Sequence, residues 1–165
     1  MLKANGVHAN FARPDHAHLT LAFFESISEQ TANELIAILR EKLLAKPYRV
    51  TLSLGKLDAF PNQKHPTVLW LEIMEKTGNL IKLKHVIDET LSSLNLPVEK
   101  RPFRAHLTVA RIKDKSISSL PDSIFENNLN FPLQHSAEIC NLTCFRSVLT
   151  SKGPVYNVIS DIKFS

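Results

Sequence analysis

Apolar and polar residues recur along this chain with two periods, one typical of helices and one typical of strands. Apolar residues spaced three or four apart predict a helix from Ser26 or Ser28 to about Lys46, and a second helix that begins at Thr77 or Asn79. The apolar stripes of these helices are formed by Leu35, Ile38, Leu39 and Leu43, and by Leu80, Leu83, Ile87, Leu91 and Leu94. Alternating or short apolar runs predict strands at 17–24, 48–57, 67–74, 103–112, 131–136, 138–149 and 155–164. The pattern therefore indicates an α+β protein.

The remaining segments are predicted to be connections. Residues 1–14 carry no pattern, 60–66 contain two prolines and read as a loop, and 113–130 are polar with room for one short helix. Lys152–Pro154 predicts the turn between the last two strands. The run at 67–74 is apolar on both sides, which is typical of a central strand.

One phrase of six residues occurs twice, as Ala-His-Leu-Thr-Leu-Ala at 17–22 and as Ala-His-Leu-Thr-Val-Ala at 105–110, 88 residues later. Because side chains alternate along a strand, the histidine and threonine of each copy share one face, and the apolar residues share the other. In the first copy we expect Leu19, Leu21 and Phe23 to face the core. The order strand–helix–strand–strand–helix–strand around the two copies indicates an internal duplication, in which a pseudo-twofold axis brings the two His/Thr strands together.

Two histidines beside two threonines suit acid–base chemistry on a phosphate. One imidazole can remove a proton while the other supplies one, and each hydroxyl can donate a hydrogen bond to a phosphate oxygen. Phosphoryl transfer depends mainly on positioning and electrostatic stabilisation, so this scheme needs no metal and no cofactor. A single His-x-Thr on a strand is common and is more often structural than catalytic. The repeat of the whole phrase is what makes the functional interpretation specific.

Two other functions fit the same residues. A cleft of this kind could hold a nucleotide or RNA without turning it over, which would make the protein a binding module. Alternatively, His16 and His18 form a His-x-His on one strand face that could begin a zinc site. The one acidic residue near them, Asp15, has the opposite parity, so a metal hydrolase would need ligands from elsewhere.

The composition limits the class of protein. At 165 residues the chain fits one domain or two small lobes, and its net charge of +4 suits an anionic partner. Cys140 and Cys144 are too few for a zinc site or a secreted disulfide scaffold, so we expect two buried free thiols in a reducing compartment. The sequence shows no signal peptide or long apolar span. We expect a soluble cytoplasmic protein.

Several further motifs extend the two His-x-Thr phrases over most of the chain. They are Leu57–Pro61, Val68–Leu71, the run 101–111 (Arg-Pro-Phe-Arg-Ala-His-Leu-Thr-Val-Ala-Arg), and Phe145–Ser147 with Tyr156. In these motifs the sequence resembles the two-histidine (2H) phosphoesterase superfamily, most closely the RNA 2',3'-cyclic phosphodiesterases also known as 2'-5' RNA ligases.

The resemblance implies one bilobal domain over residues 1–165, with two antiparallel sheets flanking a central cleft and helices on the outside. It implies metal-free hydrolysis of an RNA or nucleotide 2',3'-cyclic phosphate to a 2'-phosphate, with ligation as a possible reverse reaction. The substrates that it implies are RNA ends or cyclic nucleotides, and it implies no cofactor. The sequence itself gives no sign of a membrane segment or of a protein partner.

The resemblance also implies roles for individual residues. His18 and His106 are the acid–base pair, and Thr20 and Thr108 hold the phosphate oxygens. We assign the activation of water to His106 and the protonation of the leaving 3'-oxygen to His18, although the reverse is open. Arg111 matches the family's arginine after the second motif, yet strict alternation points it away from the cleft. Arg104, which shares the parity of His106, is the second candidate for the phosphate.

The sequence departs from the family pattern in two places. Members usually carry a strand and a helix before the first motif, whereas 17 residues precede His18 here. Either the start is truncated or an edge strand has been lost, and the second alternative would leave unpaired backbone groups at a sheet edge. Ala105 stands where a proline is common.

Overall fold

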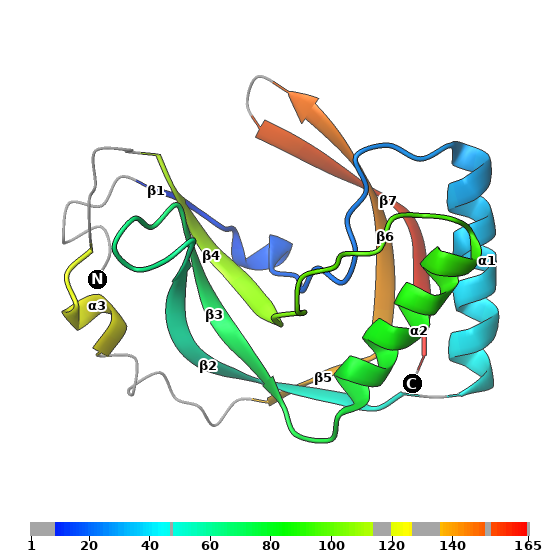
Figure 1. Ribbon diagram of the computed structural model, residues 1–165, viewed down its shortest axis with the longest axis horizontal. Coiled ribbons are helices and arrows are strands. Elements are labelled where there is room, and N and C mark those ends of the chain that lie inside the picture. The colour runs from blue at the N-terminus through cyan, green and yellow to red at the C-terminus, as the bar shows by residue number, and fades with distance from the viewer. Residues whose placement is uncertain (1–8, 47, 114–119, 127–135, 151–152, 165) are drawn as a thin grey trace. The chain divides into compact units, whose positions relative to one another are not determined.

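The computed structural model describes residues 9–46, 48–113, 120–126, 136–150 and 153–164 (Figure 1). Helices and strands are mixed along the chain, in agreement with the predicted α+β class. The elements are β1 (Ala9–Phe11), the 3-10 helix η2 (Pro14–His16), α1 (Glu29–Ala45), β2 (Val50–Phe60), β3 (Val68–Glu75), α2 (Asn79–Ser93), β4 (His106–Ile112), α3 (Ser123–Glu126), β5 (Ser136–Ile139), β6 (Asn141–Thr150) and β7 (Gly153–Lys163). The chain divides into two compact units, of residues 1–20, 52–74 and 102–137, and of residues 21–51, 75–101 and 138–165.

The first unit is organised by a five-stranded sheet with the order β1-β4-β3-β2-β5. β3 is the middle strand, as its two-sided apolar pattern predicts, and β4 pairs antiparallel with both β1 and β3. A buried apolar cluster stabilises the unit, because it removes these side chains from water. Its buried members are Leu57, Ala59, Leu69, Leu71, Ala110, Leu120 and Ile124.

The predicted strand at 17–24 is not formed, and this is a correction. β1 pairs with the end of β4, where Phe11 lies opposite Ala110, and Ala12 N donates to Val109 O. The chain then turns through η2, which begins at a proline, and returns to β4 only at Leu19. A proline fixes φ and has no N–H for a ladder, which explains why the edge strand is interrupted there.

The apolar face predicted for residues 17–24 is also smaller than expected. Leu19 and Leu21 are partly buried, whereas Phe23 is 75% exposed, so Phe23 does not belong to the core. The reason is that residues 21–24 form no strand and therefore have no alternating faces. β1 itself lies within 1–14, which the sequence pattern did not mark as structured.

The second unit contains α1 and α2, and α1 also packs on β7 (Figure 1). α1 begins at the predicted cap, because the Ser28 hydroxyl accepts a hydrogen bond from Thr31 N. α2 differs from the prediction: its N-cap is Gly78, at φ +74°. Glu75 contributes to the capping instead, because its carboxylate accepts a hydrogen bond from Leu80 N, in the first turn, at 3.4 Å. None of the described helices is long and apolar enough to cross a membrane.

The two helices bury most of the predicted apolar stripes, whereas Ile38 and Leu94 are partly buried. Buried members are Leu35, Leu39 and Leu43 of α1 and Leu80, Leu83, Ile87 and Leu91 of α2. A polar contact joins the helices, since Lys42 Nζ donates to the hydroxyl of the fully buried Thr90 at 3.2 Å. That hydroxyl also donates to Val86 O at 2.7 Å, so burial leaves it satisfied.

The C-terminal strands are divided differently from the prediction. The expected strand at 138–149 breaks at Cys140, because β5 joins the five-stranded sheet while β6 pairs with β7 in a separate two-stranded sheet. Most of the expected strand at 131–136 lies outside the described residues. Cys140 at the break is exposed and Cys144 is partly buried, so the prediction of two buried thiols is wrong for Cys140.

We expect the two thiols to react at different rates. Burial raises the pKa of Cys144, and the thiolate is the reactive form, so Cys140 should react first with a disulfide reagent near neutral pH. Following the release of thionitrobenzoate tests this. Cys140→Ser should remove the fast phase and Cys144→Ser should leave it. A fast phase that survives Cys140→Ser would contradict the assignment.

Candidate active site

The two His-x-Thr motifs, 18–20 and 106–108, lie side by side in the first unit. Their central residues, Leu19 and Leu107, form an antiparallel bridge. In this register the histidine of each phrase lies opposite the threonine of the other. Directly opposed side chains share a sheet face. The bridge therefore places four polar side chains on one face: His18, Thr20, His106 and Thr108.

Solvent can reach this group. His18 and Thr20 are exposed, whereas His106 and Thr108, which lie within β4, are partly buried. The difference follows from their strands. β4 has β3 on one side and the first phrase on the other, whereas the described part of the chain pairs the first phrase with β4 through the single bridge. A ligand would therefore contact one pair of side chains within the sheet, from β4, and one pair at its edge, from the first phrase.

Each histidine contacts a carbonyl two residues before it. His18 Nδ1 is 2.7 Å from His16 O, and His106 Nδ1 is 2.8 Å from Arg104 O. A carbonyl oxygen can only accept, so Nδ1 carries the proton in both rings. Nε2 is then the nitrogen that can take up or release a proton in each of them. The two imidazoles are thus held in the same tautomer by the same local contact.

Aromatic side chains pack around His106. Its ring meets Phe60 edge-on with centroids 5.3 Å apart, and meets Trp70 edge-on at 5.8 Å. Phe60 and Trp70 stack on each other at 4.9 Å. Such contacts restrict the ring orientation. Sequence patterns did not reveal this arrangement, because Phe60 ends β2 and Trp70 lies within β3, and only the sheet brings them together.

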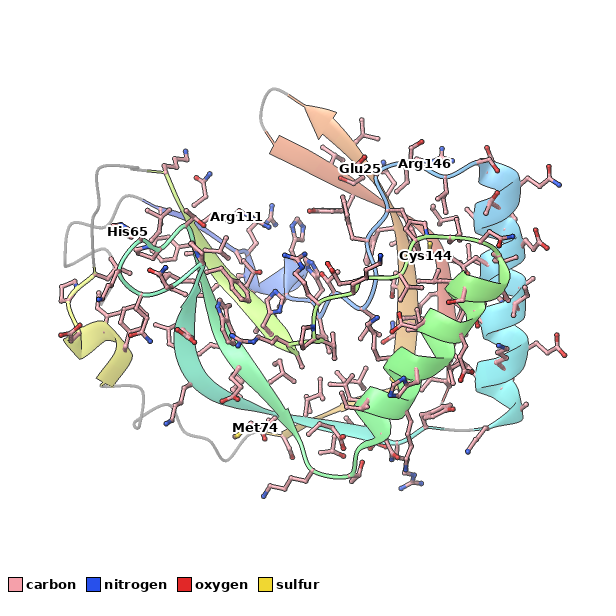
Figure 2. All side chains as sticks on the ribbon, in the orientation of Figure 1. Glu25, His65, Met74, Arg111, Cys144 and Arg146 are labelled. Atoms are coloured by element: carbon pink, nitrogen blue, oxygen red, sulfur yellow. The ribbon has the colours of Figure 1, made fainter. Side chains whose placement is uncertain are left out.

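A bulge in β4 changes where Arg111 lies. Trp70 opposes Thr108, but Leu69 opposes Ala110 and Val68 opposes Arg111, so one residue of β4 has no partner in β3. An extra residue reverses the alternation beyond it. Arg111 therefore shares the sheet face of Thr108 and His106, although strict alternation predicted the opposite. Figure 2 labels Arg111 on β4.

Arg104 contributes differently. Its backbone carbonyl holds His106, while its residue lines a separate pocket of about 460 Å³. The lining of that pocket is Asp58, Ala59, Pro61, Asn62, Gln63, Lys64, Arg104, Leu120 and Asp122. None of the four His/Thr side chains lines it, so the two arginines are associated with different parts of the first unit.

Among the described residues, no further ligands accompany His16 and His18 to form a zinc site. His16 ends η2 and is not on a strand, so the predicted shared strand face with His18 does not exist. Its carbonyl oxygen contacts His18 Nδ1. The part of the chain that the structure describes holds no group of three or more His, Cys, Asp or Glu residues suited to a metal ion.

Comparisons with known proteins agree on one family. The model of the 2'-5' RNA ligase superfamily matches residues 3–147. An RNA 2',3'-cyclic phosphodiesterase of Aeropyrum pernix is 28% identical over 160 residues, which cover 96% of this chain and 88% of that protein. The enzyme of the same name from Archaeoglobus fulgidus is 30% identical over 157 residues, covering 92% and 81%.

Solved structures share the fold. The protein TT0787 of Thermus thermophilus matches with a TM-score of 0.76 at 24% identity, covering 94% of this chain and 82% of that one. E. coli LigT complexed with 3'-AMP matches with a TM-score of 0.73 at 19% identity, covering 95% and 82%.

Proposed function

We propose, from the premise that this chain belongs to the 2'-5' RNA ligase superfamily, that it hydrolyses the 2',3'-cyclic phosphate of an RNA or nucleotide end to a 2'-phosphate. The relatives that it matches over most of its length are named RNA 2',3'-cyclic phosphodiesterase. The observation that carries the proposal is the pairing of the two phrases through Leu19 and Leu107, which aligns two histidines and two threonines on one face.

The proposed reaction uses both imidazoles. His106 Nε2 takes a proton from a water molecule whose oxygen attacks phosphorus, and the bond from phosphorus to O3' breaks. His18 Nε2 gives its proton to O3', and the phosphate stays on O2'. The matched contacts at Nδ1 support this division, because they leave the same nitrogen of each ring to transfer the proton. The roles of the two histidines could be exchanged without changing the balance of atoms.

Hydrogen bonds to the phosphate stabilise the transition state in this scheme. Thr20 and Thr108 donate their hydroxyl protons to the non-bridging oxygens, and Arg111 offers a charged pair of donors. The bulge in β4 supports the inclusion of Arg111, since it restores that side chain to the site face. Arg104 is a second candidate whose carbonyl positions His106.

The wider architecture is part of the proposal. We expect a single bilobal domain over residues 1–165, in which two sheets flank a central cleft and a pseudo-twofold axis relates the two phrases. The antiparallel bridge between equivalent leucines and the equivalent Nδ1 contacts support the local symmetry. Ligation of such ends would be the reverse of the same chemistry.

Hydrolysis should persist without metal. With excess EDTA, the protein should convert 2',3'-cyclic AMP to 2'-AMP at an undiminished rate, because none of the proposed steps uses a cation. Chromatography against 2'-AMP and 3'-AMP standards identifies the product. Loss of activity in EDTA with recovery on adding zinc would favour a metal hydrolase instead. Binding of the nucleotide without product over hours would favour a binding module with this fold.

A further inference from the structure

A glutamate of β3 is the register partner of a residue of the proposed site. Glu72 of β3 is directly opposite His106 of β4, so the two side chains share the face that carries the His/Thr group. Glu72 is exposed, and it forms no hydrogen bond or ion pair with any other residue in the described part of the chain. Its charge is therefore not neutralised by a described neighbour.

The neighbouring strand makes room for this side chain. Gly55 of β2 lies beneath Glu72, and a Cβ at Gly55 would be 2.7 Å from Glu72 Oε2 and 3.0 Å from Glu72 Cβ. A side chain at position 55 would therefore require the end of the Glu72 side chain to shift. The glycine thus allows the carboxylate to lie across β2, on the side of β3 away from His106.

A negative charge at this position cannot bind the phosphate. Like charges repel, so Glu72 weakens the binding of an anion held by the His/Thr group. A carboxylate accepts hydrogen bonds and donates none. Its hydrogen-bonding complement in a bound substrate is therefore a donor. In an RNA end with a 2',3'-cyclic phosphate, the 2', 3' and 5' oxygens of the terminal nucleotide are all esterified, and the base carries the donors that remain in that nucleotide.

We propose that Glu72 selects the base of the terminal nucleotide and favours guanine. This rests on the proposed function. Guanine presents two adjacent N–H donors, at N1 and at the 2-amino group, which match the two oxygens of one carboxylate. On the same edge adenine and cytosine place an acceptor nitrogen beside their amino group, and uracil places its one N–H between two carbonyls. Proteins read such edges when the base is unstacked.

The test compares four substrates. We would measure kcat/KM for four dinucleotides that end in the 2',3'-cyclic phosphate of guanosine, adenosine, cytidine or uridine, so that the 5' oxygen of the terminal nucleotide is esterified, with the unmodified protein and with Glu72→Gln. The unmodified protein should prefer guanosine by about tenfold, the discrimination expected of one bidentate contact. Glu72→Gln should reduce the preference to less than about threefold, because an amide offers one acceptor in place of two. Glu34→Gln, at an exposed position of α1, is the matched control and should keep the preference.

Other results would overturn the inference. Equal rates for the four substrates, or a guanosine preference that Glu72→Gln leaves unchanged, exclude base selection by this residue. An equal change for all four dinucleotides would show that Glu72 acts through His106. If the protein hydrolyses none of them, the proposed function fails separately. The dissociation constants of the four dinucleotides, for both proteins, then provide the same comparison of base preference.

Discussion

Replacing His106 by alanine should lower kcat/KM for 2',3'-cyclic nucleotides by about 10²–10⁴-fold, the range that a positioned acid or base contributes. His18→Ala should have an effect of the same size, because the proposed reaction needs one proton removed and one supplied. Both variants should fold. His18 is exposed and lies outside the helices and strands, and His106 is partly buried as the first residue of β4, so neither change removes a core side chain. Circular dichroism would verify this, and initial rates with the cyclic nucleotide give the effect.

The control is a histidine away from the site. His85 is exposed on α2, so His85→Ala should leave kcat/KM unchanged. Full activity in either His18→Ala or His106→Ala would end the proposed mechanism.

The same variants distinguish the acid from the base. A nitrophenolate leaves without a proton, so the variant that lacks the acid should recover part of its loss on a nitrophenyl phosphodiester. We expect this recovery in His18→Ala and not in His106→Ala. Recovery in the other variant would exchange the two roles.

Replacing Arg111 by alanine should lower kcat/KM by about 10²-fold, comparable to the loss of one donor from a transition-state site. The expectation depends on the bulge in β4, which puts Arg111 on the face of Thr108. Arg111→Lys should recover part of the loss, since it keeps the charge and loses the planar pair of donors. Initial rates across a range of substrate concentrations would give kcat and KM separately for each variant.

Arg104→Ala is the matched comparison and should lose much less activity. The carbonyl that contacts His106 belongs to the backbone, and alanine retains it. A loss in Arg104→Ala equal to that in Arg111→Ala would show that the second arginine also binds the phosphate, and it would weaken the argument from the bulge.

The sequence alone determined most of the regular elements. The leucine stripes of α1 and α2 are buried as predicted, because a 3.6-residue period leaves one apolar face that must be covered. β3 is central, since a strand that is apolar on both sides needs neighbours and layers around it. The duplicated His-x-Thr phrase identified the candidate site, because repetition of six residues is informative without any knowledge of their contacts.

Only the tertiary structure decided how those residues meet. The alternation rule placed Arg111 away from the site, and a bulge against β3 reversed it. The first phrase was expected to lie in a strand, yet it touches β4 at one bridge after a detour through η2. Glu72 carried no signal in the sequence, and its position opposite His106 comes from strand register. Register, bulges and edge pairing depend on residues far apart in the chain, and local patterns therefore cannot specify them.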